Sequence, residues 1–170
     1  DNFYVSGTDA LSEIINGGTG TDDEIFLTAD TQFNTANDFI NINQIYFGGF
    51  NIIVTSGSTV DFSGIDRANT GQIHGQGGNE TITGMDNADF IYGFGGDDTL
   101  IGGNGADDLY GGAGNDTLYG GDGQDDLYGE GGADTFVFEN ATAFNDVERV
   151  RDYRIAENDA IDIMDLLSGY

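Results

Sequence analysis

The chain has 170 residues, of which 31 are Asp or Glu and 4 are Arg, and it contains no Lys, Pro or Cys. Its formal net charge of −27 opposes binding to nucleic acid and to anionic membrane surfaces. No apolar run is long enough to predict a membrane-spanning helix, and the lack of Cys excludes disulfide and thiol chemistry. Because the chain opens on Asp1 rather than Met, we expect it to be part of a longer protein.

The acidic residues are concentrated in one stretch of the chain. Residues 86–134 contain twelve of them and no basic residue. Self-repulsion of this size opposes a compact state, and a Gly-rich, acidic composition would ordinarily indicate disorder. This stretch therefore either stays unfolded or folds around cations.

Residues 1–65 are predicted to form an irregular β region or an N-terminal cap. Short runs of β-branched and aromatic residues, such as 24–29, 39–47 and 51–56, alternate with Gly, Asn, Ser and Asp. Their uneven spacing is typical of wide or uneven coils that lead into a repeat, or of a small β cap.

A nine-residue repeat follows, and we place the repeat region at 66–137. Residues 102–110, 111–119 and 120–128 read GGNGADDLY, GGAGNDTLY and GGDGQDDLY, and the same register begins again at 84, 93 and 129. The sixth position is always aspartate: Asp89, Asp98, Asp107, Asp116, Asp125 and Asp134. The eighth position is always large and apolar, and with Ile82 of the preceding unit these residues form the predicted core: Ile82, Ile91, Leu100, Leu109, Leu118, Leu127 and Phe136.

This pattern predicts an all-β fold, a parallel β-roll in which two units complete one coil. Three residues around each apolar position form a strand, and the six Gly-rich residues before it form a turn. Residue i then lies over residue i+18, with strands about 4.8 Å apart. A cation midway between two coils would lie roughly 2.4 Å from each, within the Ca²⁺–oxygen range of about 2.3–2.6 Å. Mg²⁺ prefers shorter octahedral bonds, and one His without Cys cannot supply a zinc site.

The coil of two units predicts four pairs of acidic ligands. These pairs are Asp89/Asp107, Asp98/Asp116, Asp107/Asp125 and Asp116/Asp134, with Glu80/Asp98 as a weaker fifth. We therefore expect about 4–6 Ca²⁺ ions, a range that rests on oxygen ligation between coils.

Residues 138–170 leave the repeat and are predicted to cap the open end of the solenoid. Val147, Val150 and Tyr153 indicate one apolar edge, and Ile161 begins a run in which apolar and acidic residues alternate. Three of the four basic residues lie here, Arg149, Arg151 and Arg154, and we expect them to pair with nearby acids.

The repeat resembles the RTX family of calcium-binding nonapeptides, GGxGxDxUx, although the units at 84–92 and 93–101 lack the leading double glycine. The resemblance implies that backbone carbonyls at the second and fourth positions also bind Ca²⁺: Gly96, Gly103, Gly105, Gly112, Gly114, Gly121 and Gly123. It also implies that Asp152 and Asp159 contribute to a further calcium site.

The outward positions of the repeat provide a candidate binding surface. Tyr92, Tyr110 and Tyr128 form one row, and Thr99, Thr117 and Thr135 form another. Such rows stabilise a sheet by lateral packing, and a polysaccharide is a further candidate partner for the tyrosines.

No arrangement of catalytic residues is found in the sequence, so we expect no enzyme activity in this chain. The resemblance implies a calcium-binding β-roll of a large secreted or surface protein of a Gram-negative bacterium, most plausibly an adhesin. It further implies export through type I secretion machinery and folding on extracellular calcium. The alternative is an accessory calcium- or polysaccharide-binding module of a secreted enzyme, such as a mannuronan epimerase or metalloprotease.

Overall fold

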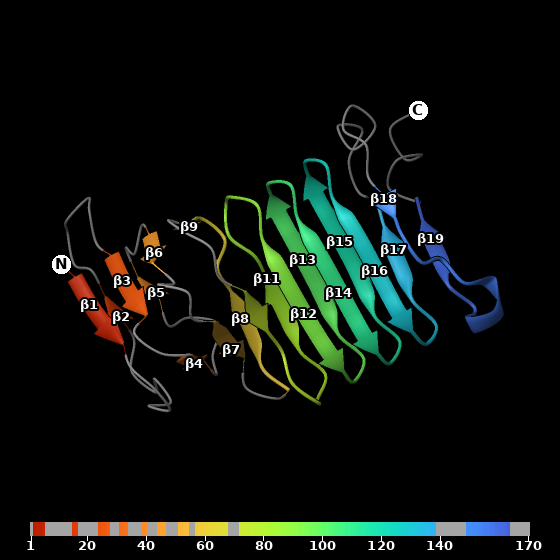
Figure 1. Cartoon of the computed structure of the whole chain (residues 1–170), viewed down its shortest axis with the longest axis horizontal. Helices are drawn as coiled ribbons and strands as arrows, with labels where there is room; N and C mark the ends of the chain where they lie inside the picture. Colours follow the sequence, from red (N-terminus) through yellow and green to blue (C-terminus); the bar gives the residue numbers. More distant parts are fainter. Residues whose placement is uncertain are drawn as a thin grey trace.

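The computed structural model describes residues 51–54, 57–65, 72–138 and 149–163, together with the backbone of short strands at 2–5, 15–16, 24–27, 31–33, 39–40, 44–46 and 66–67. These residues form parallel strands stacked along one axis, from the red N-terminal strands at one end to the blue C-terminal strands at the other (Figure 1). No helix in the described part of the chain is long and apolar enough to span a membrane.

The repeat region contains the strands of the regular roll. They are β10 (Ile73–His74), β11 (Thr81–Thr83), β12 (Phe90–Gly95), β13 (Thr99–Asn104), β14 (Asp108–Ala113), β15 (Thr117–Asp122), β16 (Asp126–Gly131) and β17 (Thr135–Val137). Successive strands alternate between two parallel sheets, with the order β10-β12-β14-β16 in one and β11-β13-β15-β17 in the other. The predicted all-β parallel solenoid is therefore confirmed.

The register between coils is constant throughout this region, because each residue pairs with the equivalent residue two repeat units on. Ile73 pairs with Ile91, Leu109 pairs with Leu127, and Leu118 pairs with Phe136. The eighth-position side chains consequently form two inward columns, and all seven predicted core residues are fully buried. Burial of each such side chain stabilises the fold by about 1.5–3 kcal/mol.

The strands are longer than the sequence predicts. β12 to β16 each have six residues, because the first three positions of the following unit continue to pair with the next coil. In β12, for example, Phe94 pairs with Gly112 and Gly95 with Ala113. The first three of the six residues predicted as a turn therefore belong to the paired strands.

The strands that precede the roll are short and also pair in parallel. They are β1 (Asn2–Val5), β2 (Ile15–Asn16), β3 (Glu24–Leu27), β4 (Thr31–Phe33), β5 (Phe39–Ile40), β6 (Gln44–Tyr46), β7 (Ile52–Val54), β8 (Thr59–Asp61) and β9 (Asp66–Arg67). β1, β3, β6 and β9 form one sheet and β2 and β5 another, whereas β4, β7 and β8 extend the two sheets of the roll. Ile52 pairs with Ile73 and Val60 pairs with Ile82, and both spacings are longer than two repeat units. β7 and β8 therefore join the roll through connections of uneven length, and the choice between uneven coils and a cap for residues 1–65 stays a prediction.

The C-terminal segment adds one more coil to the roll. It contains β18 (Arg149–Val150), the 3-10 helix η2 (Ile155–Glu157) and β19 (Ala160–Asp162). β18 pairs with β16 and β19 with β17, so both sheets continue past residue 137. Arg149 Nε lies 2.5 Å from Asp126 Oδ1 and Arg151 Nη2 lies 2.8 Å from Asp126 Oδ2, which confirms the predicted pairing with acids. Of the predicted apolar edge, Val147 lies outside the described residues, Val150 packs partly buried against the core, and Tyr153 is exposed.

Two residues of the repeat region have side chains although their backbone positions favour glycine. Phe94 and Glu130 stand at the second position of their units with φ of 75° and 68°, where three other units have Gly103, Gly112 and Gly121. The left-handed region costs a residue with a Cβ about 1–2 kcal/mol. Glu130 is exposed, so its side chain offers little packing to offset this cost.

Glu130→Gly is therefore expected to stabilise the folded protein by about 1 kcal/mol, because relief of the left-handed strain exceeds the entropy that glycine loses on folding. Urea unfolding at saturating calcium measures the effect. Glu130→Gln is the control, because it removes the same charge but keeps the Cβ. If Glu130→Gly were no more stable than Glu130→Gln, the hypothesis of backbone strain at Glu130 would be wrong.

Candidate metal sites

The sixth-position aspartates link each coil to the one before it. They are buried, with 0–1% of their surface exposed, and Oδ1 accepts a hydrogen bond from the backbone N–H of the equivalent residue in the preceding coil. The N–O distances are 2.7 Å for Asp89/Asp107, 2.8 Å for Asp98/Asp116, 2.8 Å for Asp107/Asp125 and 3.0 Å for Asp116/Asp134. The structure thus brings together the four pairs that the repeat predicts.

In the middle of the roll, the second carboxylate oxygen of the sixth-position aspartates has no hydrogen-bond donor. Oδ2 of Asp98 and of Asp116 is buried and accepts no hydrogen bond. In Asp89, nearer the N-terminal end of the roll, Oδ2 accepts the N–H of Met85 at 2.6 Å. A buried, ionised oxygen without a donor is costly, and a bound cation would compensate it.

Burial changes the acidity of these carboxyl groups. It raises the pKa of Asp98 to about 6 and that of Asp116 to about 7, although hydrogen bonds from the backbone of Glu80 and Asp98 respectively oppose the shift. Repulsion from Asp98 and Asp134 further raises the pKa of Asp116, and burial likewise raises the pKa of Asp134. Ionisation of these buried aspartates therefore costs free energy in the folded chain.

The first-position glycines keep a space open beside the carboxylates. An ideal Cβ on Gly93 would lie 2.3 Å from Asp98 Oδ2 and 2.5 Å from the carbonyl oxygen of Gly111, one coil further on. The corresponding distances at Gly102 are 2.4 Å to Asp107 Oδ2 and 2.5 Å to the Gly120 carbonyl oxygen. A carboxylate and a carbonyl thus converge where a side chain would otherwise be, and such an all-oxygen cradle suits Ca²⁺.

The predicted carbonyl ligands lie where successive coils come closest. All seven glycines have φ between 103° and 147°, and the carbonyls of Gly96, Gly103, Gly105 and Gly114 approach the equivalent glycine one coil on. Among the described residues, no three acidic or His side chains form a cluster able to hold a metal. A cation in this part of the chain would therefore need backbone carbonyls as well as aspartates. The carbonyls of Gly111 and Gly120 were not predicted, because only the stacking of coils reveals them.

The carboxylates at the two ends of the roll are arranged differently. Both oxygens of Glu80 accept backbone N–H groups, from Gly57 at 2.5 Å and Gln76 at 2.9 Å. Asp152 accepts the N–H of Gly129 at 2.9 Å and of Glu130 at 2.7 Å. Asp159 accepts the N–H of Asp134 at 3.2 Å and of Arg154 at 2.5 Å. Protein donors thus already engage both oxygens at these ends, and calcium ligation by Asp152 and Asp159 stays a prediction.

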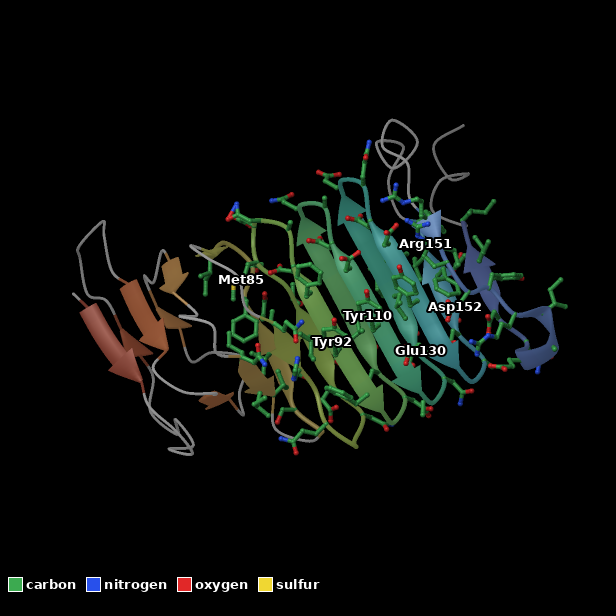
Figure 2. All side chains as sticks on the ribbon, in the orientation of Figure 1. Met85, Tyr92, Tyr110, Glu130, Arg151 and Asp152 are labelled. Carbon is green, nitrogen blue, oxygen red and sulfur yellow. The ribbon has the colours of Figure 1, made fainter. Side chains whose placement is uncertain are left out.

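The outward tyrosines stack on one another. The ring centroids of Tyr92 and Tyr110 are 4.6 Å apart and those of Tyr110 and Tyr128 are 4.5 Å apart, with interplanar angles of 4° and 8°. Figure 2 shows Tyr92 and Tyr110 side by side over neighbouring strands. Since a sugar ring would stack on the face of an aromatic ring, this packing leaves mainly ring edges for a ligand, and it supports lateral stabilisation of the sheet.

The raised pKa values predict that acid promotes folding of the ion-free chain. For Asp98 and Asp116 the folded-state pKa exceeds the unfolded value of 3.8, so the folded state binds more protons between about pH 4 and pH 7. Stability falls as pH rises through this range. Circular dichroism of calcium-depleted protein should show more β structure at pH 5.5 than at pH 8. A double variant, Asp98→Asn with Asp116→Asn, should show a weaker dependence, and an equal dependence would contradict the assignment.

Comparison with known families agrees with this geometry. The model of the RTX calcium-binding nonapeptide repeat (4 copies) matches residues 74–109 and 101–136. No curated protein and no solved structure matches the chain.

Proposed function

Because residues 74–136 are RTX calcium-binding nonapeptide repeats, we propose that this chain is a folding module that calcium switches on, with Ca²⁺ held between successive coils of the roll. The observation that carries the proposal is the row of buried sixth-position aspartates, in which Asp98 and Asp116 each keep one oxygen without a hydrogen-bond donor. Ca²⁺ supplies the missing positive charge there.

The net charge explains why folding should depend on the ion. At −27, self-repulsion and the entropy lost by a Gly-rich backbone both oppose collapse. Each ion would connect two coils and neutralise charge at the same time. Since the coils are linked in series, binding and folding should be cooperative.

A calcium titration followed by circular dichroism tests the proposal. We expect a steep gain of β structure at about 10⁻⁴–10⁻³ M calcium, the range of extracellular calcium modules, and no equal gain with magnesium. A chain already fully folded in excess chelator at pH 7.5, or one that responds equally to both ions, would contradict it.

We further propose that this calcium dependence couples folding to export. At low intracellular calcium the chain would stay unfolded, which is the state that type I secretion machinery transports, and outside the cell it would fold. The low affinity expected for extracellular modules supports this division. The parent protein would then be secreted or displayed at the cell surface, and an adhesin is our first candidate.

The alternative parent is a secreted enzyme that uses the roll as an accessory module. The repeat segment itself is a structural calcium-binding unit, and we assign it no catalytic step. The stacked tyrosines give little support for polysaccharide binding at this face.

A further inference from the structure

The last loop of the roll contains a built-in cation. The guanidinium of Arg154, in the segment between β18 and η2, donates from Nη1 to the carbonyl oxygen of Glu130 and to Oε2 of Glu157, the latter at 3.3 Å. Its Nη2 lies 4.0 Å from Oδ2 of Asp152. One positive group thus lies among a carbonyl and two carboxylates, all oxygen acceptors (Figure 2 labels Glu130 and Asp152).

The carbonyl of Glu130 is at a position where the resemblance to the repeat family implies a calcium ligand. Glu130 stands at the second position of the last unit, and its φ of 68° is positive, like the 103° of Gly103 and of Gly121 at the same position. The Glu130 carbonyl thus shares its repeat position and its positive φ with carbonyls of earlier loops, and here a guanidinium lies beside it. Between residues 75 and 148 the sequence contains no Arg or Lys, and the Arg149 and Arg151 guanidinium groups pair with the side chain of Asp126.

The position of Arg154 at the end of the row has a physical reason. An ion between coils takes oxygen ligands from both, whereas the last loop has only the cap segment beyond it, which does not follow the repeat. Asp152 already binds the N–H groups of Gly129 and Glu130, and Asp159 binds those of Asp134 and Arg154. These bonds hold the cap on the roll, and Arg154 adds one positive charge that offsets part of the negative charge of Asp152 and Glu157.

We propose that Arg154 takes the place of Ca²⁺ at the loop formed by Glu130, Asp152 and Glu157, so that the row of ions ends one loop earlier than the acidic residues do. The inference rests on calcium binding by the preceding loops. It differs from the expectation that Asp152 and Asp159 form a further calcium site, because the acceptors around Asp152 are already paired with a cation of the chain.

Counting the bound Ca²⁺ ions tests whether Arg154 takes the place of an ion. Native mass spectrometry at saturating calcium should show one more Ca²⁺ on Arg154→Gln than on the unaltered chain, because the vacated loop becomes available. Adding Asp152→Asn to that variant should return the count to its original value. Arg149→Gln is the matched control, because Arg149 pairs with Asp126 at the first residue of β16, four residues before Glu130, and its loss should leave the count unchanged.

Equal counts for Arg154→Gln and the unaltered chain would overturn the inference, as would an Arg154→Gln chain that stays unfolded at saturating calcium. A crystal structure of the unaltered chain grown with calcium gives a result independent of any variant: a guanidinium beside the Glu130 carbonyl supports the substitution, and an ion there overturns it. A chain that binds no calcium at all would instead refute the proposed function, and this inference with it.

Discussion

Replacing Asp116 by asparagine is expected to weaken the calcium-loaded fold and to strengthen the ion-free fold. Asparagine keeps the size of the side chain and an oxygen that can accept the N–H of Asp98, now at 2.8 Å from Asp116 Oδ1. It removes the charge of a carboxyl group whose pKa burial raises to about 7. Without calcium, the buried negative charge of Asp116 destabilises the fold. With calcium, the same carboxylate binds the ion and stabilises the fold.

The two effects can be measured separately. Loss of an interaction with a charged group costs about 1.5–3 kcal/mol, and about 1.4 kcal/mol corresponds to a factor of ten. Because folding is coupled to several ions, each tenfold change in calcium is worth about 1.4 kcal/mol per ion. With about four ions, the calcium midpoint for folding should therefore rise about two- to fourfold. In chelator at pH 8, the urea midpoint of any residual β structure should rise instead. Asp122→Asn removes the same charge at an exposed position and should change both values much less. A variant destabilised under both conditions would show that Asp116 only fills space.

The regular part of the fold could be predicted because one period describes both its core and its stacking. A large apolar residue every ninth position places Leu109 and Leu118 on opposite sheets, and a coil of two units places Leu109 under Leu127. Local sequence and global register agree at every step, so no information from distant residues was needed.

The ends could not be predicted in the same way, because their coils have different lengths. Ile52, Phe62 and Met85 extend the core, yet Ile52 pairs with Ile73, further on than two repeat units, and belongs to no unit of the repeat. At the other end Phe136 pairs with Ile161, which is a still longer step along the chain. The register of two parallel strands depends on the length of the segment that connects them. At both ends of the roll this segment differs in length from the one in the neighbouring coil, so the period cannot predict the register.

The same limit applies to the candidate site. Counting two repeat units on from Asp134 leads to Asp152, but the side chain that accepts the N–H of Asp134 is Asp159. Asp152 instead binds the first two N–H groups of the last unit. The row of aspartates followed from the period, whereas the contacts of Arg154 depend on a cap loop whose path the period does not describe.

The fourth-position glycines should be the least replaceable residues of the roll. Gly123→Ala is expected to destabilise the calcium-loaded fold by about 2–5 kcal/mol, because the new side chain adds both left-handed strain and overpacking at Gly123. Its φ is 147°, and an ideal Cβ would lie 1.4 Å from the carbonyl oxygen of Gly105 in the preceding coil. That atom is backbone and cannot rotate away. The coils would have to separate, and separation also moves the oxygens of Asp107 and Asp125 apart.

Gly95→Ala is the matched control, because the nearest atom to its added Cβ is the Ala113 carbonyl oxygen at 3.7 Å, an ordinary contact, and its φ lies outside the left-handed region. Urea unfolding at saturating calcium should separate the two variants clearly, and the calcium midpoint should rise for Gly123→Ala alone. Similar stabilities would mean that the coils can move apart at little cost. In that event the spacing between coils would be set by the bound ions, and the fourth position would not require glycine, since any residue supplies the same backbone carbonyl.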